Sequence, residues 1–360
     1  MAEVLPQLRE GEMVSGRYRV MKKLGEGGFG AVYKVAEGDN QYALKVEGAR
    51  DQIQILKMEV YVLEALASRQ GRHFAAIIGK GRNAQFNYVV MTLLGQSLDD
   101  LRKINPQQKF HISTAIRVGV QCLEALEDLH GIGYLHRDVK PGNFAMGRPE
   151  IGEQRKLYVL DFGMCRRFVN ERGLLRTPRS AAGFRGTVRY ASINCHLSRE
   201  LSRRDDVETW FYQQVELTKG HLPWRNVENR DEVGRYKERC RQLPALNELL
   251  GGCPKEYIDV MRYVDNLRFF DRPDYNQVYS IMNTAARNLG VKENDPYDWE
   301  QADDQPCMTL AGMDNKLFDK NAKPQSAAPK RPDVGPQKFK DPNDKLYMTL
   351  AGMDNRVFDR

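Results

Sequence analysis

The distribution of apolar and polar positions changes its period along the chain. Over residues 17–46 apolar residues alternate with polar ones on both sides of a glycine-rich turn, which predicts a strand, a turn and two further strands. Over residues 51–68 apolar residues recur at spacings of three and four, which predicts an amphipathic helix. A mostly apolar run at residues 86–94 predicts a buried strand. This part of the chain is expected to form a small β-rich lobe with one main helix.

Beyond that run the pattern becomes mainly helical. A long helix of mixed apolar face is predicted over residues 113–130, and helices are predicted for most of the chain after Asp205, with loops at 220–223 and 251–254. The predicted fold class is therefore α+β, in which the β-rich lobe precedes a larger α-helical lobe.

The end of the chain differs in composition. Residues 321–345 hold five prolines and five lysines with almost no aliphatic residues, too little apolar surface to offset the entropy of ordering a chain. On either side stands one copy of the motif MTLAGMDN-x-x-FD, at residues 308–319 and 348–359. The sequence between the copies does not repeat, so two short motifs joined by a linker fit better than a structural repeat. We expect residues 296–360 to be a mostly disordered tail.

Composition narrows the class of protein without identifying it. The 360 residues are 41% hydrophobic and carry a net charge of +7, which favours acidic partners without indicating nucleic acid. No apolar run approaches the ~18 residues that span a bilayer, and the N-terminus has no signal-peptide architecture. The six cysteines form no CxxC pair, which argues against zinc and against a disulfide framework. We expect a cytoplasmic monomer with reduced thiols, with nuclear entry left open, that binds neither nucleic acid nor a membrane.

Two short motifs, at residues 136–143 and 161–163, hold the residue types that phosphoryl transfer needs. At this spacing Asp138 would orient the attacking hydroxyl, while Asn143 and Asp161 would hold Mg²⁺, or Mn²⁺, against the phosphates of ATP. His136 is expected to be a packed structural residue. The pair of motifs resembles the catalytic core of protein kinases.

A glycine-rich turn upstream fits a nucleotide site. Gly25, Gly27, Gly30 and Val32 match the kinase pattern G-x-G-x-x-G-x-V, in which backbone N–H groups approach phosphate oxygens without a Cβ in the way. A dinucleotide fingerprint would need a helix to open at the third glycine. Strand-forming residues follow instead.

The strand after this turn carries a candidate phosphate-binding lysine. Lys45, two residues after Ala43, would reach the α and β phosphates. Its predicted partner is Glu59 on the amphipathic helix. Glu64 is the alternative, and the glutamate that is not the partner should face solvent.

Residues around the predicted catalytic aspartate indicate the class of substrate. Lys140, two residues after Asp138, is typical of serine/threonine kinases, in which this lysine neutralises the transferring phosphate. Thr187 is expected to bridge Asp138 and Lys140. Between Asp161 and Asn194 seven arginines stand against two acids, so this segment should attract an acidic or already phosphorylated substrate.

Over residues 17–299 the chain resembles the casein kinase 1 group, and within it the tau-tubulin kinase branch. The resemblance rests on Ser192-Ile193-Asn194 in place of the usual Ala-Pro-Glu and on the stretches 143–148, 182–187, 222–225 and 294–299. It implies a two-lobed, ATP- and Mg²⁺-dependent serine/threonine kinase that is active without obligatory phosphorylation of its activation loop. The implied domains are an extension (1–16), a kinase domain (17–295; N-lobe 17–91, hinge 92–95, C-lobe 96–295) and the tail (296–360).

The resemblance also implies roles for single residues. Met91 would be the gatekeeper of the adenine site, and Thr92 and Leu94 would belong to the hinge. Asp206 would be the buried aspartate that supports the catalytic loop. Arg189 would bind a substrate phosphate or a free anion, together with Arg185.

Two departures from the group stand out. Glu228 occupies a position where the group usually has a basic residue that helps to bind the anion, which puts strict dependence on a pre-phosphorylated substrate in doubt. Trp210, Gln213 and Gln214 replace residues that are more often apolar.

Two hypotheses of different classes follow. The first is an active serine/threonine kinase with a preference for acidic or pre-phosphorylated protein substrates. The alternative is a scaffold that uses a kinase fold to bind partners through the repeated tail motif. For the tail we expect either bivalent docking on a partner or autophosphorylation at Thr309 and Thr349.

Overall fold

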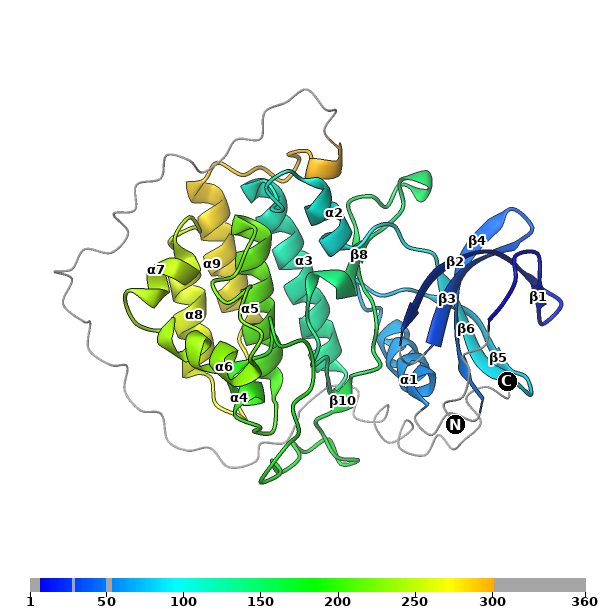
Figure 1. Ribbon diagram of the computed structural model, residues 1–360, viewed down its shortest axis with the longest axis horizontal. Helices are drawn as coiled ribbons and strands as arrows, with labels where there is room; N and C mark the ends of the chain where they lie inside the picture. The colour runs from blue at the N-terminus through cyan, green and yellow to red at the C-terminus, as the bar shows by residue number, and fades with distance from the viewer. Residues whose placement is uncertain (1–6, 28–29, 50–53, 301–360) are drawn as a thin grey trace.

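The computed structural model describes residues 7–27, 30–49 and 54–300, which form two lobes (Figure 1). The strands lie mostly in one lobe and the helices mostly in the other, as the predicted α+β class requires. The elements are β1 Met13–Val14, β2 Tyr18–Gly27, β3 Gly30–Glu37, β4 Asn40–Gly48, α1 Ile55–Ser68, β5 Ile77–Arg82, β6 Phe86–Thr92, α2 Leu98–Ile104, α3 Ile112–Gly131, β7 Tyr134–Leu135, η1 Pro141–Asn143, β8 Phe144–Met146, η2 Pro149–Ile151, β9 Leu157–Val159, β10 Arg166–Arg167, α4 Ile193–His196, α5 Arg203–Lys219, α6 Arg230–Arg239, α7 Ala245–Leu250, α8 Tyr257–Asn266, α9 Tyr275–Asn288 and η3 Asp298–Glu300.

The N-lobe is an antiparallel sheet with one helix packed against it. Within the described residues the strand order is β1-β2-β3-β4-β6-β5. Alternate residues of β3, such as Tyr33 and Val35, are buried in the core of the lobe, so the alternating pattern of the sequence corresponds to one buried face. The three predicted strands and the later strand are confirmed, and α1 covers the described part of the predicted helix.

The C-lobe is organised around α5, which is buried along nearly its whole length. This burial explains why α5 lacks an amphipathic pattern. Its polar side chains donate hydrogen bonds to α3: Trp210 Nε1 to the Gly119 carbonyl at 2.8 Å and Gln214 Nε2 to the Ala115 carbonyl at 2.9 Å. A Cβ at Gly119 would lie 2.0 Å from Gln214 Oε1, so a larger residue there would displace the Gln214 amide that bonds to α3.

The described fold includes residues on both sides of the predicted kinase domain, 17–295. Strand β1 pairs with β2 through Met13 and Val14, inside the predicted extension. At the other end the Trp299 ring stacks on the Tyr297 ring at 4.7 Å, and Arg155 holds Glu300 through two hydrogen bonds of 2.8 Å. The tail from residue 301 on, with both motif copies, lies outside the described residues. Among the described helices we find none that is both long and apolar enough to cross a bilayer.

Candidate active site

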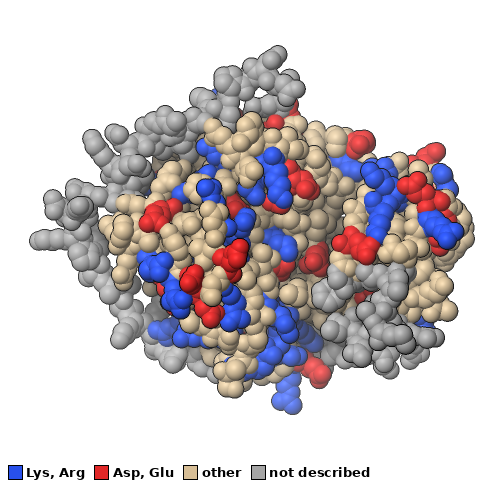
Figure 2. Space-filling model, in the orientation of Figure 1, with Lys and Arg blue, Asp and Glu red and all other residues tan. Residues whose placement is uncertain are grey.

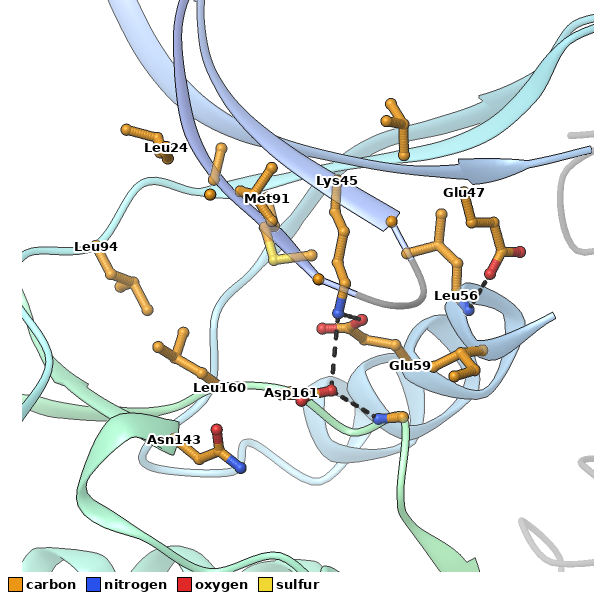
Figure 3. A pocket seen from close by; sticks show the side chains of 18 of the residues that line it. Leu24, Lys45, Glu47, Leu56, Glu59, Met91, Leu94, Asn143, Leu160 and Asp161 are labelled. Carbon is orange, nitrogen blue, oxygen red and sulfur yellow. Dashed lines mark hydrogen bonds and ion pairs between the residues drawn. The ribbon is translucent and has the colours of Figure 1, made fainter. Parts of the chain in front are cut away.

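A cleft of about 440 Å³ between the lobes has one apolar end and one charged end. Figure 3 shows Leu24, Leu94 and Leu160 on one side of this cleft and Lys45, Glu59 and Asp161 on the other, with Met91 between them and Asn143 below Leu160. Val32, Ala43 and Thr92 complete the apolar end, next to the described backbone that joins the lobes. Such a cleft can hold a flat apolar ring system at one end and anionic groups at the other.

The glycine-rich hairpin closes the cleft from above. Gly27 pairs with Gly30 where β2 turns into β3. A Cβ at Gly30 would lie 2.2 Å from the Val46 carbonyl oxygen, so packing alone requires glycine there. A Cβ at Gly25 or Gly27 would meet nothing within 4 Å. Those two glycines leave open space on the cleft side, where backbone N–H groups can approach a phosphate.

Lys45 lies at the centre of the charged end. Its Nζ is 2.5 Å from Glu59 Oε2 and 3.8 Å from Asp161 Oδ1. Burial lowers the pKa of Lys45, but the Glu59 and Asp161 carboxylates outweigh it and the pKa is raised, so the ammonium is charged at neutral pH. Glu64, the alternative partner, is partly exposed, and its Oε1 lies 2.5 Å from Lys80 Nζ. It therefore forms an ion pair of its own, which the sequence did not predict.

The catalytic loop brings three predicted residues together. Thr187 Oγ1 donates to Asp138 Oδ1 at 2.8 Å, and Lys140 Nζ donates to Asp138 Oδ2 at 2.7 Å and to Thr187 at 3.3 Å. Burial alone would raise the pKa of Asp138. The hydrogen bonds from Lys140 and Thr187 together outweigh burial, so the pKa of Asp138 is lowered. Asp138 is therefore an ionised acceptor with a fixed orientation.

Asn143 and Asp161 offer the donor set for a divalent cation. Asn143 Nδ2 donates to the Asp138 carbonyl at 2.8 Å, which leaves the amide oxygen as its second functional atom. Asp161 has φ +59°, a left-handed conformation held in part by the Gly163 N–H, which donates to Asp161 Oδ1 at 3.1 Å. One carboxylate and one amide oxygen fit Mg²⁺, which commonly binds one or two carboxylates together with substrate phosphates and water.

Asp206 supports the catalytic loop from α5. Its carboxylate accepts the backbone N–H groups of His136 and Arg137 at 2.7 and 2.8 Å, and it contacts the His130 ring at 2.8 Å. These bonds hold Arg137 at φ +68°. The fully buried His136 ring packs between Phe144 and Phe162, as a structural residue would.

Comparison with known proteins agrees with this geometry. A family model described as the protein kinase domain matches residues 18–279. The chain belongs to the protein kinase family.

The kinase is similar to serine/threonine kinases of several organisms. It is 36% identical to serine/threonine-protein kinase spe-6 of Caenorhabditis elegans over 79% of its own length and 76% of that protein. It is 32% identical to casein kinase I homolog 1 of Schizosaccharomyces pombe over 81% of its own length and 66% of that protein. A Dictyostelium discoideum protein described as a probable serine/threonine-protein kinase is 39% identical over 81% of the chain, which spans 58% of that relative. The chain is thus a serine/threonine protein kinase of the casein kinase 1 group, in agreement with the tau-tubulin kinase-like branch that the sequence resembles.

The substrate side of the kinase is held by residues that the sequence did not reveal. Lys237, fully buried on α6, donates to the carbonyls of Val188 and Ala191 at 2.9 and 2.6 Å. Trp224 Nε1 donates to the carbonyl of the intervening Arg189 at 2.8 Å. The segment from Val188 to Ala191 follows Thr187 directly, so these donors fix the substrate loop beside the catalytic aspartate. The motif at 222–225 carried the family resemblance, but nothing in it indicated this contact.

Arg189 already has an acidic partner. Its Nη1 lies 3.3 Å from Oε1 of Glu216, a buried residue of α5. The Tyr190 hydroxyl binds the other oxygen of the same carboxylate. The predicted role of Arg189 as an anion ligand therefore meets a competitor within the fold, while Arg185 is exposed.

A second group of arginines lies closer to the catalytic loop. Burial lowers the pKa of Arg137, and the like charges of Arg166 and Arg185 lower it further. Glu200 neutralises part of this charge through Arg166 and Arg179. Figure 2 shows Lys and Arg side chains gathered below the cleft, over the part of the C-lobe that carries β10 and α4. An anion placed there would lower the repulsion among the guanidinium groups.

Proposed function

We propose that this kinase transfers the γ-phosphate of ATP to serine or threonine hydroxyls that lie near acidic or already phosphorylated residues. The observation that carries the proposal is the gathering of Arg137, Arg166 and Arg185 beside the catalytic loop, where the charges of Arg166 and Arg185 lower the pKa of Arg137 and the Arg185 side chain is exposed. A carboxylate or phosphate on the substrate would bind this cluster through charge-assisted hydrogen bonds.

The contacts of Arg189 favour a broad acidic preference over a strict requirement for a phosphate. Glu216 partly cancels the charge of Arg189, and Glu228 is exposed where a base would have added to it. A phosphate carries more charge than a carboxylate and more acceptor oxygens. We therefore expect a pre-phosphorylated substrate to be favoured by a modest factor.

The geometry supports a transfer in which position matters more than base strength. Asp138, held by Thr187 and Lys140, would accept a hydrogen bond from the substrate hydroxyl and aim its oxygen at the γ-phosphate. Lys45, held by Glu59, would bind the phosphates that do not react. Mg²⁺ at Asn143 and Asp161 would supply charge neutralisation along the phosphate chain. The hydroxyl proton would pass to Asp138 as the new oxygen–phosphorus bond forms and the bond between the γ-phosphorus and the β,γ-bridging oxygen breaks, which releases ADP.

Initial rates on three matched peptides test the proposal. The peptides would be unmodified, aspartate-rich or pre-phosphorylated, with Asp161→Asn as the blank. We expect the pre-phosphorylated peptide to be favoured over the unmodified one by roughly tenfold, about 1.4 kcal/mol, with the aspartate-rich peptide between them. Arg185→Gln should reduce this ratio, whereas Arg172→Gln, a matched change at an exposed arginine of the same segment, should leave it nearly unchanged. Equal rates on all three peptides would contradict the proposed preference.

The second candidate function is a scaffold that binds a partner through the repeated tail motif. The duplication of a twelve-residue motif within one tail favours such docking, since two linked weak sites gain affinity from effective concentration. A scaffold has no need of the contacts among Lys45, Glu59, Asp138 and Thr187. If Asp161→Asn kept every cellular function of the wild type, the scaffold would replace the enzyme as the main proposal.

We also propose that the kinase acts as a monomer in the cytoplasm. The five cysteines within the described residues are buried free thiols, which suits a reducing compartment. Sedimentation of the full chain would test the monomer, and imaging of the tagged full chain would test the location.

A further inference from the structure

A groove on the C-lobe lies apart from the nucleotide cleft and from the substrate loop. It has a volume of about 930 Å³ and lies between α3, α9 and the segment that leads to η3. Figure 1 shows α3 and α9 side by side, with the last described segment across their ends. The apolar part of its wall consists of Ile116, Val120, Tyr279, Ala286 and Val291.

The described chain ends at the rim of this groove. Tyr297 lines the groove and is held by the Trp299 ring, by the Arg117 guanidinium at 4.0 Å and by a hydrogen bond from Gln121 at 3.2 Å. Glu300, three residues later, is fixed by Arg155. The tail therefore leaves the kinase domain from a fixed point beside the groove.

The charged part of the wall is mostly basic. Arg117 is used internally, since it donates to the carbonyls of Ser113, Glu293 and Pro296. Arg287 and Lys292 are exposed and line the groove. Within the described residues Glu293 is the one acidic side chain of the lining. A segment that fits should therefore combine apolar side chains with acids.

We propose that this groove binds the first tail motif, residues 308–319, of the same chain. The motif supplies apolar and acidic residues together, namely Met308, Leu310, Met313, Leu317 and Phe318 with Asp314 and Asp319. Seven residues separate it from Glu300, and they can span at most about 25 Å.

Linker length selects the first copy over the second. A short flexible linker gives an effective concentration on the order of 1 mM, so a motif with an intrinsic Kd of about 50 µM would be bound roughly 95% of the time. The second motif is forty residues further along the chain. Its effective concentration at the groove is lower by roughly tenfold, because concentration falls steeply with linker length. The second copy is thus left for a partner.

Binding of a fluorescent peptide of residues 305–320 to the full chain tests the proposal. In the wild type the tethered first motif competes for the groove, so the apparent Kd should be about eightfold weaker than in Leu310→Asp/Met313→Asp, where the second motif still competes weakly. The matched variant Leu350→Asp/Met353→Asp should behave as the wild type does. Adding Arg287→Glu/Lys292→Glu to the first-motif variant should abolish peptide binding, and because both side chains are exposed the fold should be kept. Kinase activity on a short peptide, measured in parallel, reports that fold.

Each alternative occupant of the groove predicts a different binding result, and any one of these results would overturn the proposal. Peptide binding that is equal in the wild type and the first-motif variant would mean that the groove is not filled from its own tail. If only the second-motif variant bound the peptide more tightly than the wild type, the groove would be assigned to the second copy. Absence of peptide binding in the first-motif variant, or binding that survives Arg287→Glu/Lys292→Glu, would remove the groove as the acceptor.

Discussion

The nucleotide side and the substrate side of the cleft have opposite electrostatic designs. On the nucleotide side unlike charges meet: Lys45 lies 2.5 Å from Glu59, and Lys140 lies 2.7 Å from Asp138. On the substrate side the like charges of Arg166 and Arg185 lower the pKa of the half-buried Arg137, and Glu200 offsets only part of this positive charge. The first side is held by internal ion pairs, whereas the second keeps unbalanced positive charge.

This difference separates catalysis from selection. A preorganised site requires no reorganisation when ATP arrives, so its residues should mainly affect the rate of transfer. A cluster with unbalanced positive charge acts over a longer range and should mainly affect which substrate is held. Variants on the nucleotide side should therefore change mainly kcat, and variants on the substrate side should change mainly the KM for the protein substrate.

Asp138→Asn should give the largest effect. The amide keeps the shape of the side chain but loses the charge that accepts from Thr187 and Lys140, so kcat should fall by about 10²- to 10⁴-fold. The KM for ATP should change little, because Asp138 acts on the hydroxyl. Steady-state kinetics would check both, and Asp100→Asn, an acid at the start of α2, is a matched control. A variant that keeps more than a tenth of wild-type kcat would contradict the role of Asp138.

Lys237→Met should lower stability and, among the kinetic parameters, change only the KM for the protein substrate. The variant leaves the carbonyls of Val188 and Ala191 without their donor, which should lower the free energy of unfolding by about 1–3 kcal/mol. The loosened substrate loop should also raise the KM for a protein substrate by roughly tenfold and leave the KM for ATP unchanged, a loss of about 1.4 kcal/mol of binding.

Lys219→Met separates these two effects. Lys219 also donates to two carbonyls, those of Glu248 and Leu249, but it lies at the far end of α5. Its loss should reduce stability without any change in the KM for the protein substrate. If both variants changed that KM equally, Lys237 would be a stabilising residue with no special relation to the substrate loop.

The same contrast explains how much the sequence could predict. The fold class and most element positions followed from hydrophobic period, and the residues of the nucleotide side stand in motifs whose spacing reflects their chemistry. The sequence favoured Glu59 over Glu64 as the partner of Lys45, but spacing did not fully separate the two, and the structure pairs Lys45 with Glu59. The structure forms two of the predicted pairs at hydrogen-bond distance, Lys45 with Glu59 and Asp138 with Thr187.

The substrate side was less accessible because its contacts join residues far apart in the chain. Lys237 meets Val188 across 49 positions, and Glu216 meets Arg189 across 27. Glu216 lies on α5, where buried polar residues obscure any amphipathic pattern, and Lys237 lies on the mostly exposed α6, where a buried lysine is not expected. Arg189 was consequently predicted as an anion ligand without the carboxylate that competes for it. Trp210 and Gln214 were similarly unexplained until α3 was seen to supply their acceptors.

Acid should affect the substrate side before the nucleotide side. Burial, followed by the charge of Lys237, lowers the pKa of His196 to about 4, whereas the unfolded chain would bind that proton near pH 6.5. Between these values the unfolded state holds more protons, so the contribution of His196 to stability is intact above pH 6.5 and is lost as pH falls towards 4. The loss should be about 1–3 kcal/mol, because the proton must enter a site that contacts Lys237 at 3.1 Å. Asp138, whose pKa is lowered, should stay ionised through most of this range.

Urea unfolding at pH 7 and pH 4.5 would measure this loss of stability, and His196→Gln should make the free energy of unfolding depend less on pH. Equal pH dependence in the variant and the wild type would show that other groups, such as the His130–Asp206 pair, govern the acid response.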